Sequence, residues 1–390
     1  MKPLRLAYVC SNPSYSLSSK AGYAIHIKSL LEAFSKRGAN ISVFMPQHIR
    51  KVNTAMADQI PKPHRLRQYF PKMIWSTAKD IRRIYQDIQF YSRVTKTLES
   101  EPVDIIYERL DYLGSRLPKM LDMNKYKYVV EIHAPLDEEQ TLFNGDSLLA
   151  KQLLLNVKRS LFAAHSIVTV SDYMKQWLLK SGVSGEKICV SHNAVDINMF
   201  ERSTQESPNV VNIGFVGSMA PWHRVDVLFK AFIEIYQKHP IHLTIAGPIS
   251  ADILKMQDLE RLVNDKAISL LGSIKHEDIP SVLSRLSIGV MPGSNMYGSP
   301  IKIFEYGAAG LAVIAASTPA IREIITDGVD GILIESGNSH QLKNALEKLI
   351  CDSELRKALS SNLNDKVCKN YTWAKTAQTI LGHILKNEEV

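Results

Sequence analysis

Short runs of apolar and β-branched residues alternate with longer amphipathic stretches along most of the chain. In the first half, five such runs are Leu6–Cys10, Ile41–Met45, Val103–Tyr107, Tyr128–Ile132 and Ile167–Val170. None alternates strictly between apolar and polar residues, which is typical of strands buried on both faces of a parallel sheet. After the first run, the stretch that ends before Gly38 repeats apolar residues at helical spacing. The chain therefore opens as a β-α-β unit.

The same alternation starts again after a polar, aperiodic segment, 201–210, which we interpret as a linker. The later runs are Val211–Val216, His242–Ala246, Ile268–Leu271, Ile288–Met291, Val313–Ala315 and Ile332–Ile334. Three helices, expected to serve for packing, follow around 339–350, 353–368 and 373–386. The pattern predicts an α/β protein with two doubly wound, Rossmann-like domains, 1–205 and 206–370.

The charge balance is modestly basic, with 47 Lys and Arg against 39 Asp and Glu in 390 residues. An excess of this size suits an anionic substrate or surface. Nucleic-acid binding is not expected, because such proteins concentrate their charge more strongly. Four scattered cysteines without a C-x-x-C pair favour a reducing compartment, and no apolar run is long enough for a signal peptide or a membrane span. We therefore expect a cytoplasmic protein.

Ligands of open α/β sheets bind beyond the carboxyl ends of the strands, so the loops that follow strands are the candidate sites. The first loop, 11–24, lacks the glycine pattern of a dinucleotide site, and only Gly22 lies at the expected helix start. Gly22 is either a simple turn residue or a point where the backbone approaches a phosphate. His133 ends another strand shortly before Pro135, where it is either a ligand-facing or an ordinary core or surface histidine.

The loop 217–224 leads into a helix that begins near Val225. His223 and Arg224 could donate hydrogen bonds to an anion at that helix end. A solvated basic turn is the alternative interpretation.

The loop 292–300 gives the strongest signal. Ser299 is a favourable N-cap and Pro300 a favourable first helical residue, so the amides of the first turn could bind an anion. Lys302 in that turn opposes the helix dipole unless a bound anion is present. Glu305, one turn further, could reach a polar group of the same ligand, such as a ribose diol. Alternatively, Lys302 and Glu305 form a weak helical ion pair.

Five strings follow one another along the second half of the chain: GFVGSMAPWHRVDVLFKAF, the strand end IAGP, LLGSIKHEDIPSVLSRLSIGVMPGS, SPIKIFEYGAAG and the tail YTW. Together and in this order they resemble retaining glycosyltransferases of family 4, which have the GT-B fold. The resemblance implies two Rossmann-like domains facing across a cleft, with 371–390 crossing back to the first. It implies transfer of a sugar from a nucleoside-diphosphate donor of the UDP or GDP type, bound by the second domain, to an acceptor bound by the first.

The resemblance also assigns roles to residues. Glu305 matches the second glutamate of the family's Glu-x7-Glu signature, which holds the ribose hydroxyls, whereas Tyr297 replaces the first. Either backbone amides around 295–298 take the place of the missing carboxylate, or the activity is altered or lost. The implied catalytic residues are His133, Lys302 and Glu305, with His133 next to the transferred sugar. The implied donor-binding residues are Gly22, Gly217, His223, Arg224, Ile274, Tyr297, Gly298, Ser299, Pro300, Ile301, Lys302 and Glu305, with Ile274 at the nucleobase.

The implied reaction retains anomeric configuration without a protein nucleophile, and it transfers a hexosyl group. No cofactor or metal is expected: the chain has no Asp-x-Asp motif, and Lys302 with the helix amides would stabilise the leaving diphosphate. The acceptor would be a glycan, a glycolipid or a natural-product intermediate. Two alternatives stay open, a nucleotide-sugar epimerase on the same fold and a catalytically weak nucleotide-sugar-binding relative.

The segment 48–96 carries eleven Lys or Arg against three Asp, interleaved with aromatic and aliphatic residues. Such a mixture suits contact with an anionic membrane surface, and so a peripheral position at the inner face of the membrane. A solvated insertion beside the acceptor site is the alternative.

Overall fold

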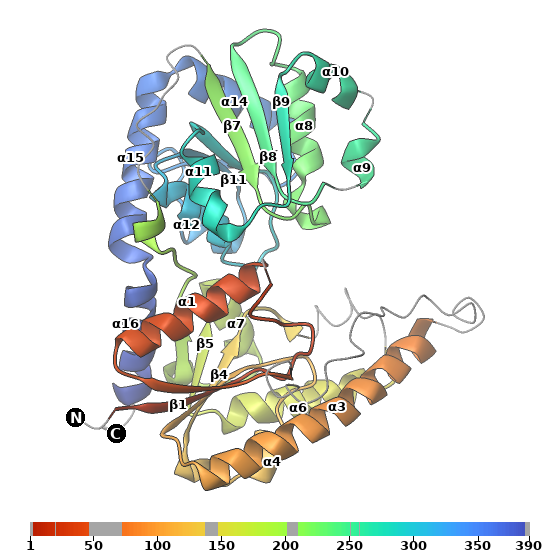
Figure 1. Cartoon of the computed structure of the whole chain (residues 1–390), viewed down its shortest axis with the longest axis vertical. Coiled ribbons are helices and arrows are strands. Elements are labelled where there is room, and N and C mark those ends of the chain that lie inside the picture. The colour runs from red at the N-terminus through yellow and green to blue at the C-terminus, as the bar shows by residue number, and fades with distance from the viewer. Residues whose placement is uncertain are drawn as a thin grey trace. The chain divides into compact units, whose positions relative to one another are not determined.

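The computed structural model describes two compact units, each built on its own parallel sheet (Figure 1). The described residues are 3–19, 21–46, 72–136, 147–200, 210–249, 251–256 and 258–386. Those of the first unit fall within Met1–Val170, Met174–Ser191 and Ala377–Val390, and those of the second within Ser171–Tyr173 and His192–Thr376. The predicted linker lies outside the described residues except for Val210.

The first sheet has six parallel strands in the order β2-β1-β3-β4-β5-β6. They are β1 Arg5–Val9, β2 Asn40–Phe44, β3 Ile105–Arg109, β4 Lys127–Ile132, β5 Ser166–Thr169 and β6 Ile188–Val190. Five of them agree with the predicted runs to within about two residues, whereas β6 was not predicted.

β3 lies two residues later than predicted because it ends in two charged residues, Glu108 and Arg109, that are nevertheless buried. The carboxylate of Glu108 accepts hydrogen bonds from the hydroxyls of Tyr91 and Tyr128, the latter at 2.6 Å. Burial raises the pKa of Glu108 to about 7. A charged residue can therefore belong to a fully buried strand here because its polar atoms are paired.

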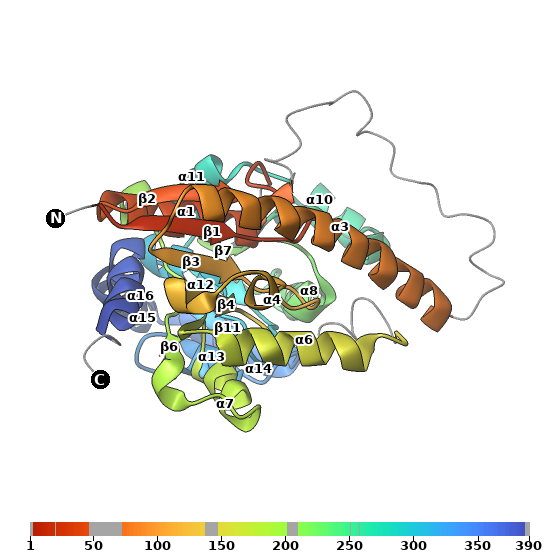
Figure 2. The ribbon, with the colours of Figure 1, turned by 90° about the horizontal axis from the view of Figure 1, so that it is seen from below.

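Helices cover both faces of this sheet. These helices are α1 Gly22–Lys36, α3 Lys72–Ser100, α4 Leu117–Met120, α6 Ala150–Ala163 and α7 Asp172–Lys180, of which α7 belongs to this unit from Met174 onward. α1 lies on one face of the sheet, and α3, α4 and α6 lie on the other (Figures 1 and 2). α1 begins at the glycine where the sequence places a helix start.

The second sheet also has six parallel strands, in the order β12-β11-β10-β7-β8-β9. They are β7 Val211–Val216, β8 Ile241–Ala246, β9 Ile268–Gly272, β10 Ile288–Met291, β11 Ala312–Ala316 and β12 Ile332–Ile334. All six coincide with predicted runs. Its helices are α8 Val225–Ile233, α9 Ala251–Leu254, α10 Leu259–Asn264, α11 Ile279–Leu283, α12 Ile301–Ala308, α13 Pro319–Arg322, α14 Ser339–Cys351 and α15 Ser353–Asn370.

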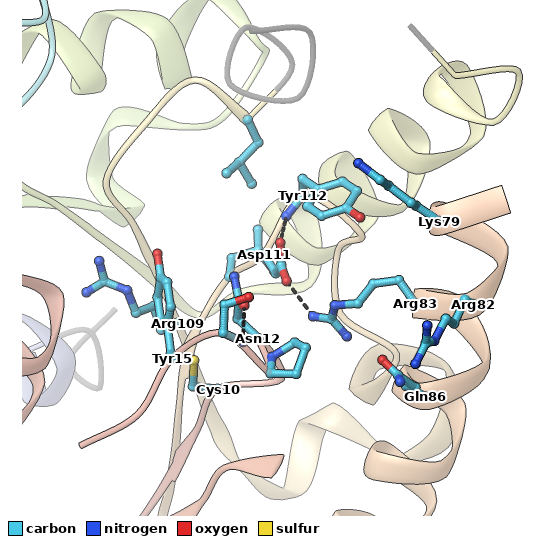
Figure 3. A pocket seen from close by; sticks show the side chains of 14 residues that line it. Cys10, Asn12, Tyr15, Lys79, Arg82, Arg83, Gln86, Arg109, Asp111 and Tyr112 are labelled. Carbon is cyan, nitrogen blue, oxygen red and sulfur yellow. Dashed lines mark hydrogen bonds and ion pairs between the residues drawn. The ribbon is translucent and has the colours of Figure 1, made fainter. Parts of the chain in front are cut away.

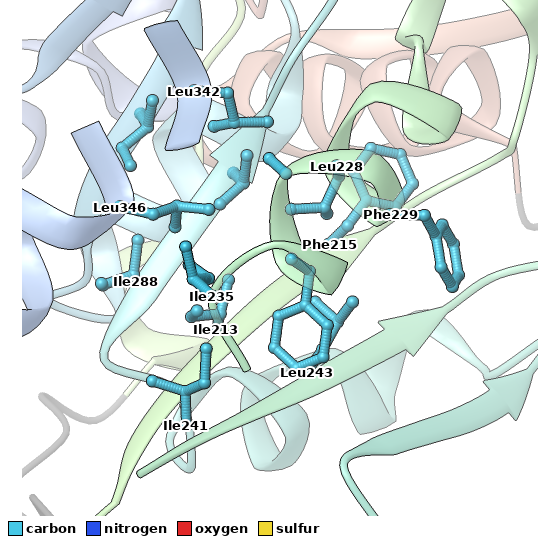
Figure 4. Packing of buried hydrophobic residues seen from close by; sticks show 14 of the residues in the cluster. Ile213, Phe215, Leu228, Phe229, Ile235, Ile241, Leu243, Ile288, Leu342 and Leu346 are labelled. Carbon is cyan, nitrogen blue, oxygen red and sulfur yellow. The ribbon is translucent and has the colours of Figure 1, made fainter. Parts of the chain in front are cut away.

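Buried apolar residues cover both faces of this sheet: one cluster lies against the helices α8 and α14 (Figure 4), and another lies against α12 and α15. Phe215 of β7 and Phe229 of α8 are almost completely buried, as are Leu342 and Leu346 of α14. Within α8 and α14, the buried apolar residues recur at helical spacing.

The last helix, α16 Trp373–Lys386, is divided between the units, because residues from Ala377 onward group with the first unit. Gln378 accepts a hydrogen bond from Arg37 at 3.1 Å, and Ile384 is fully buried. Among the described residues, no helix is long and apolar enough to cross a bilayer.

Candidate functional site

In the second unit, the loop 292–300 and helix α12 follow β10, as predicted, but the helix is capped differently. Pro300 is the N-cap residue and Ile301 the first helical residue, so the predicted Ser299 cap is wrong by one position. The Ser299 hydroxyl instead accepts a hydrogen bond from the backbone N–H of Asn193 at 3.1 Å, and the Asn193 side-chain amide donates to the Ser299 carbonyl. The first turn of α12 therefore has no side-chain cap, so its backbone amides can donate to a ligand there.

The loop before α12 is held by its own side chains. Asn295 Oδ1 accepts from the Gly298 N–H at 2.7 Å, and a side chain at Gly298 would collide with Asn295. The Tyr297 carbonyl accepts from the Ser171 hydroxyl at 2.8 Å. The Gly298 amide is thus already engaged, so it is not a free donor that could replace the missing glutamate.

Lys302 lies in the first turn of α12, as predicted, and its ammonium group donates a hydrogen bond to the ring of His223. Its Nζ is 3.1 Å from Nε2 of His223 and 5.1 Å from the ring centroid of Phe215. Burial lowers the pKa of Lys302 to about 7, and burial together with Lys302 lowers the pKa of His223 to about 3. An acidic ligand placed here would meet a lysine that is only partly protonated at neutral pH.

Gly217, which precedes this group in the loop after β7, is required by its backbone and by space. Its φ is +145°, and a Cβ atom would lie 3.0 Å from Cε of Lys302. Arg224 also has a positive φ, of 50°, but its guanidinium pairs with Asp226 at 3.2 Å. Of the two predicted donors of this loop, His223 is therefore the one that lies next to Lys302.

Glu305 is 5 % exposed, and its Oε1 accepts from Nε2 of His276 at 3.0 Å. The carboxylate of Glu305 is thus paired with His276, and the ammonium group of Lys302 lies against His223. The alternative prediction, an ion pair between Lys302 and Glu305 along the helix, does not describe these contacts. Ile274 lies two residues before His276 and packs against the apolar cluster around α12. His276 was missed by the sequence reasoning, because a lone histidine in a loop gives no signal of its own.

In the first unit, His133 belongs to a buried cluster at the end of β4. Oε1 of Glu131 accepts from Nε2 of His26 at 2.6 Å and from Nε2 of His133 at 3.0 Å. The Arg109 guanidinium lies 3.5 Å from the other carboxylate oxygen and 3.3 Å from Nδ1 of His133. Its carbon is also 5.5 Å from the ring centroid of Tyr15.

The electrostatics of this cluster fix its protonation. Burial opposes ionisation of Glu131, but His26 and His133 hold its pKa well below the usual range. Burial and Arg109 lower the pKa of His133 to about 3, so the ring is neutral at neutral pH. His26, Glu131 and His133 place three ligand-type atoms within 4.8 Å of one another, but the adjacent Arg109 charge disfavours a cation there. The cluster fits a hydrogen-bonded network that orients His133.

Comparison with known proteins places these sites in a family. Residues 21–199 match the model of Glycosyltransferase Family 4, and residues 211–352 match that of Glycosyl transferases group 1. One uncharacterised glycosyltransferase of Methanocaldococcus jannaschii is 23 % identical over 385 residues, 92 % of each chain. Another is 22 % identical over 223 residues, 55 % of this chain and 57 % of that relative, so the match spans little more than half of its length.

Solved structures with the same fold include sucrose-phosphate synthase from Thermosynechococcus elongatus, with a TM-score of 0.72, 16 % identity and 98 % of both chains covered. The HepE protein of Anabaena in complex with UDP matches with a TM-score of 0.66 and 16 % identity, over 98 % of this chain and 100 % of that one. The two parallel-sheet units and these structural matches define the GT-B fold, and the two family models show that the chain is a glycosyltransferase. The chain belongs to the family 4 type of these enzymes, as the sequence motifs indicate.

Proposed function

We propose that this glycosyltransferase moves a hexosyl group from a nucleoside-diphosphate sugar to an acceptor with retention of anomeric configuration. The single observation that carries the proposal is the arrangement on α12, where Lys302 lies in an uncapped first turn and a buried Glu305 follows one turn later. A cation and free amides suit a diphosphate, and a buried carboxylate suits a diol. The HepE protein, which has the same fold, was solved with UDP and with UDP-glucose.

In this mechanism the chain acts by electrostatics. As the bond between the sugar and the diphosphate breaks, negative charge grows on the diphosphate, and Lys302 with the α12 amides stabilises it. Glu305 holds the ribose and thereby positions the diphosphate at the helix end. His133, whose neutral ring is held between Glu131 and Arg109, keeps the place next to the transferred sugar that the family resemblance assigns to it. These roles need neither a metal nor a cofactor.

A nucleotide panel tests the donor site directly. The thermal stability of the protein is measured with UDP, GDP, ADP and their common sugar conjugates. One nucleotide at about 100 times its dissociation constant should add roughly 2.7 kcal/mol, several degrees in melting temperature. Glu305→Ala should weaken that binding at least about tenfold, because a charged group's hydrogen bonds contribute about 1.5–3 kcal/mol.

Glu277→Ala is the matched control, since Glu277 is exposed on the same segment as His276 and pairs only with Lys275 among the described residues. A shift that survives in folded Glu305→Ala would contradict the assignment of Glu305. No shift with any nucleotide would contradict the donor site itself. A Glu305-dependent shift without sugar transfer to any acceptor would favour the catalytically weak relative, for which Tyr297 in place of the first glutamate is the supporting observation. Interconversion of the free donor without an acceptor would instead indicate an epimerase.

Membrane contact is the second part of the proposal. Of the predicted segment 48–96, the part before residue 72 lies outside the described residues. The described part of α3 exposes apolar side chains on one face, at Ile74, Ile81, Tyr85 and Ile88. α6, which covers the same face of the sheet, exposes Leu155 and Phe162 (Figure 2). An apolar face beside basic residues is the composition of an interfacial helix.

Sedimentation with vesicles tests this contact. The protein should bind vesicles rich in anionic lipid at low salt and lose most of that binding at high salt. Replacing Ile81 and Ile88 together by Glu should lower the partition coefficient about tenfold or more, because apolar contact is lost and repulsion is added. Leu254→Glu, at an equally exposed position of α9, should bind as the wild type does. Equal binding of all three proteins would exclude this face as the contact surface.

A further inference from the structure

The first unit contains a cavity of about 360 Å³ at the carboxyl ends of β1 and β3, beside α3 (Figure 3). One wall is formed by the loop after β1, from Cys10 to Tyr15, and another by the residues that end and follow β3, from Arg109 to Tyr112. The carboxyl end of a parallel sheet is where such folds bind ligands. None of the predicted donor-binding residues and none of the quoted sequence strings lines this cavity.

The third wall is a polar stripe on α3. Lys79, Arg82, Arg83 and Gln86 repeat at the spacing i, i+3, i+4, i+7, so all four point to the same side of the helix (Figure 3). Arg109, at the end of β3, also lines the cavity, although its guanidinium group points away from α3 (Figure 3). The cavity is thus lined by four cationic side chains, while Asp111 is its one carboxylate among the described residues.

Two of these cations are already neutralised. Arg83 donates to Asp111 at 2.6 Å and to the Ser11 carbonyl at 3.0 Å, and Arg109 lies beside Glu131. Both guanidinium groups are largely buried, with side chains 13 % and 9 % exposed. Because Asp111 is paired with Arg83, its carboxylate does not repel an anion in the cavity.

The other two cations have no such partner. Lys79 and Arg82 are exposed side chains of the same wall, and no carboxylate in the described part of the chain pairs with either. The cavity therefore carries two positive charges in excess, one of them a guanidinium with the planar donor geometry that suits phosphate oxygens. A doubly charged phosphoryl group matches this excess better than a single carboxylate does.

We propose that this cavity binds a phosphoryl group of the acceptor, held by Lys79 and Arg82, so that the acceptor is a phosphorylated molecule. The acceptor role rests on the proposed function, in which the first unit receives the acceptor. Arg83 and Asp111 shape the site but do not carry its net charge. The phosphoryl group belongs either to a soluble phosphorylated sugar or alcohol or to a lipid.

Binding of inorganic phosphate tests the site without knowledge of the acceptor. Phosphate is titrated at constant ionic strength into the protein saturated with its nucleotide, so that the donor site is filled, and the melting temperature is recorded. We expect a saturable rise for the wild type. The double variant Lys79→Met/Arg82→Met should raise the apparent dissociation constant at least about tenfold. Arg93→Met/Lys96→Met, which removes the same charge from exposed positions of α3 away from the cavity, should behave as the wild type does.

Equal phosphate binding by both double variants, or no saturable shift in the wild type, would overturn the proposal. A second arm identifies the source by comparing vesicles containing phosphatidic acid, a phosphate monoester, with vesicles containing phosphatidylglycerol at equal molar fraction. A preference for phosphatidic acid that only the cavity variant loses indicates a lipid, whereas phosphate binding without this preference indicates a soluble acceptor; both support the site.

The two proposals fail separately. If UDP and the other nucleotides produce no shift, the proposed function fails, and the phosphate titration is still interpretable in the nucleotide-free protein. If a nucleotide binds in a Glu305-dependent manner while phosphate does not bind the cavity, the donor site stands and the phosphoryl site is rejected.

Discussion

Replacing Lys302 by methionine is expected to weaken UDP binding about a hundredfold while leaving the protein folded. The change removes the cation of the first turn of α12, whose Nζ atom lies 3.1 Å from Nε2 of His223. No carboxylate in the described part of the chain forms an ion pair with this lysine, so its charge is available to the diphosphate. Loss of one partner of a buried charge pair costs about 2–5 kcal/mol, and about 2.7 kcal/mol corresponds to a factor of one hundred. Titration calorimetry with UDP gives the affinity, and circular dichroism confirms the fold.

The same lysine predicts a pH dependence. Burial lowers its pKa from 10.5 to about 7, and a bound diphosphate favours the protonated form, so UDP binding should take up a proton. The affinity should be steady below about pH 7 and fall above it, approaching tenfold per pH unit. UDP itself does not cause this slope, because the second pKa of a terminal phosphate is about 6.

Lys302→Arg is the matched control, since arginine stays charged at these pH values and should remove the slope. Without nucleotide, the unfolded chain binds a proton at Lys302 between about pH 7 and 10.5 that the folded chain lacks. The contribution of Lys302 to the free energy of unfolding should therefore rise with pH across that window. A wild-type affinity for UDP that is constant from pH 7 to pH 9 would contradict this account.

Glu131→Gln is expected to cost the first unit about 3–5 kcal/mol of stability. The carboxylate is 1 % exposed and is shared by His26, His133 and Arg109. When Glu131 loses its charge, the buried guanidinium group of Arg109 has no counter-charge. Removal of one partner from a buried ion pair carries a penalty of this size. Hydrogen exchange of the peptide that contains β4 measures the loss within this unit.

Two further variants separate the charge effect from a general effect of substitution. Glu32→Gln, at an exposed position of α1 paired only with Lys36 among the described residues, should change stability by less than about 0.5 kcal/mol. Glu131→Gln combined with Arg109→Met removes both charges and should be less destabilised than Glu131→Gln alone. Equal exchange in Glu131→Gln and the wild type would show that the network contributes little.

The sequence predicts both sheets well because their strands are buried on both faces and therefore read as continuous apolar runs. It fails where polar residues are buried with partners from distant parts of the chain. The predicted β3 begins two residues too early because nothing local shows that Glu108 is hydrogen-bonded by Tyr128 or that Arg109 is paired with Glu131. Pairings over such separations in sequence depend on the folded arrangement.

In the candidate sites, too, local sequence predicts some features, whereas others depend on the folded arrangement. The positions of Lys302 and Glu305 on one helix follow from local spacing, and the structure has them there. The N-cap of that helix was misplaced because Ser299 bonds to Asn193, more than a hundred residues earlier, rather than to its own helix. The basic cavity was missed as well, since Lys79 and Arg82 line one cavity with Arg109 only through the packing of α3 on the sheet.

The division of α16 between the units has a consequence for the order in which the molecule is completed during synthesis. Apart from Ser171–Tyr173, the second unit is one continuous stretch that ends at Thr376, whereas the first needs Ala377 and the residues after it. Fully buried Ile384 comes from that last part. Because chains are made from the N-terminus, the unit that is begun first is the one that is finished last.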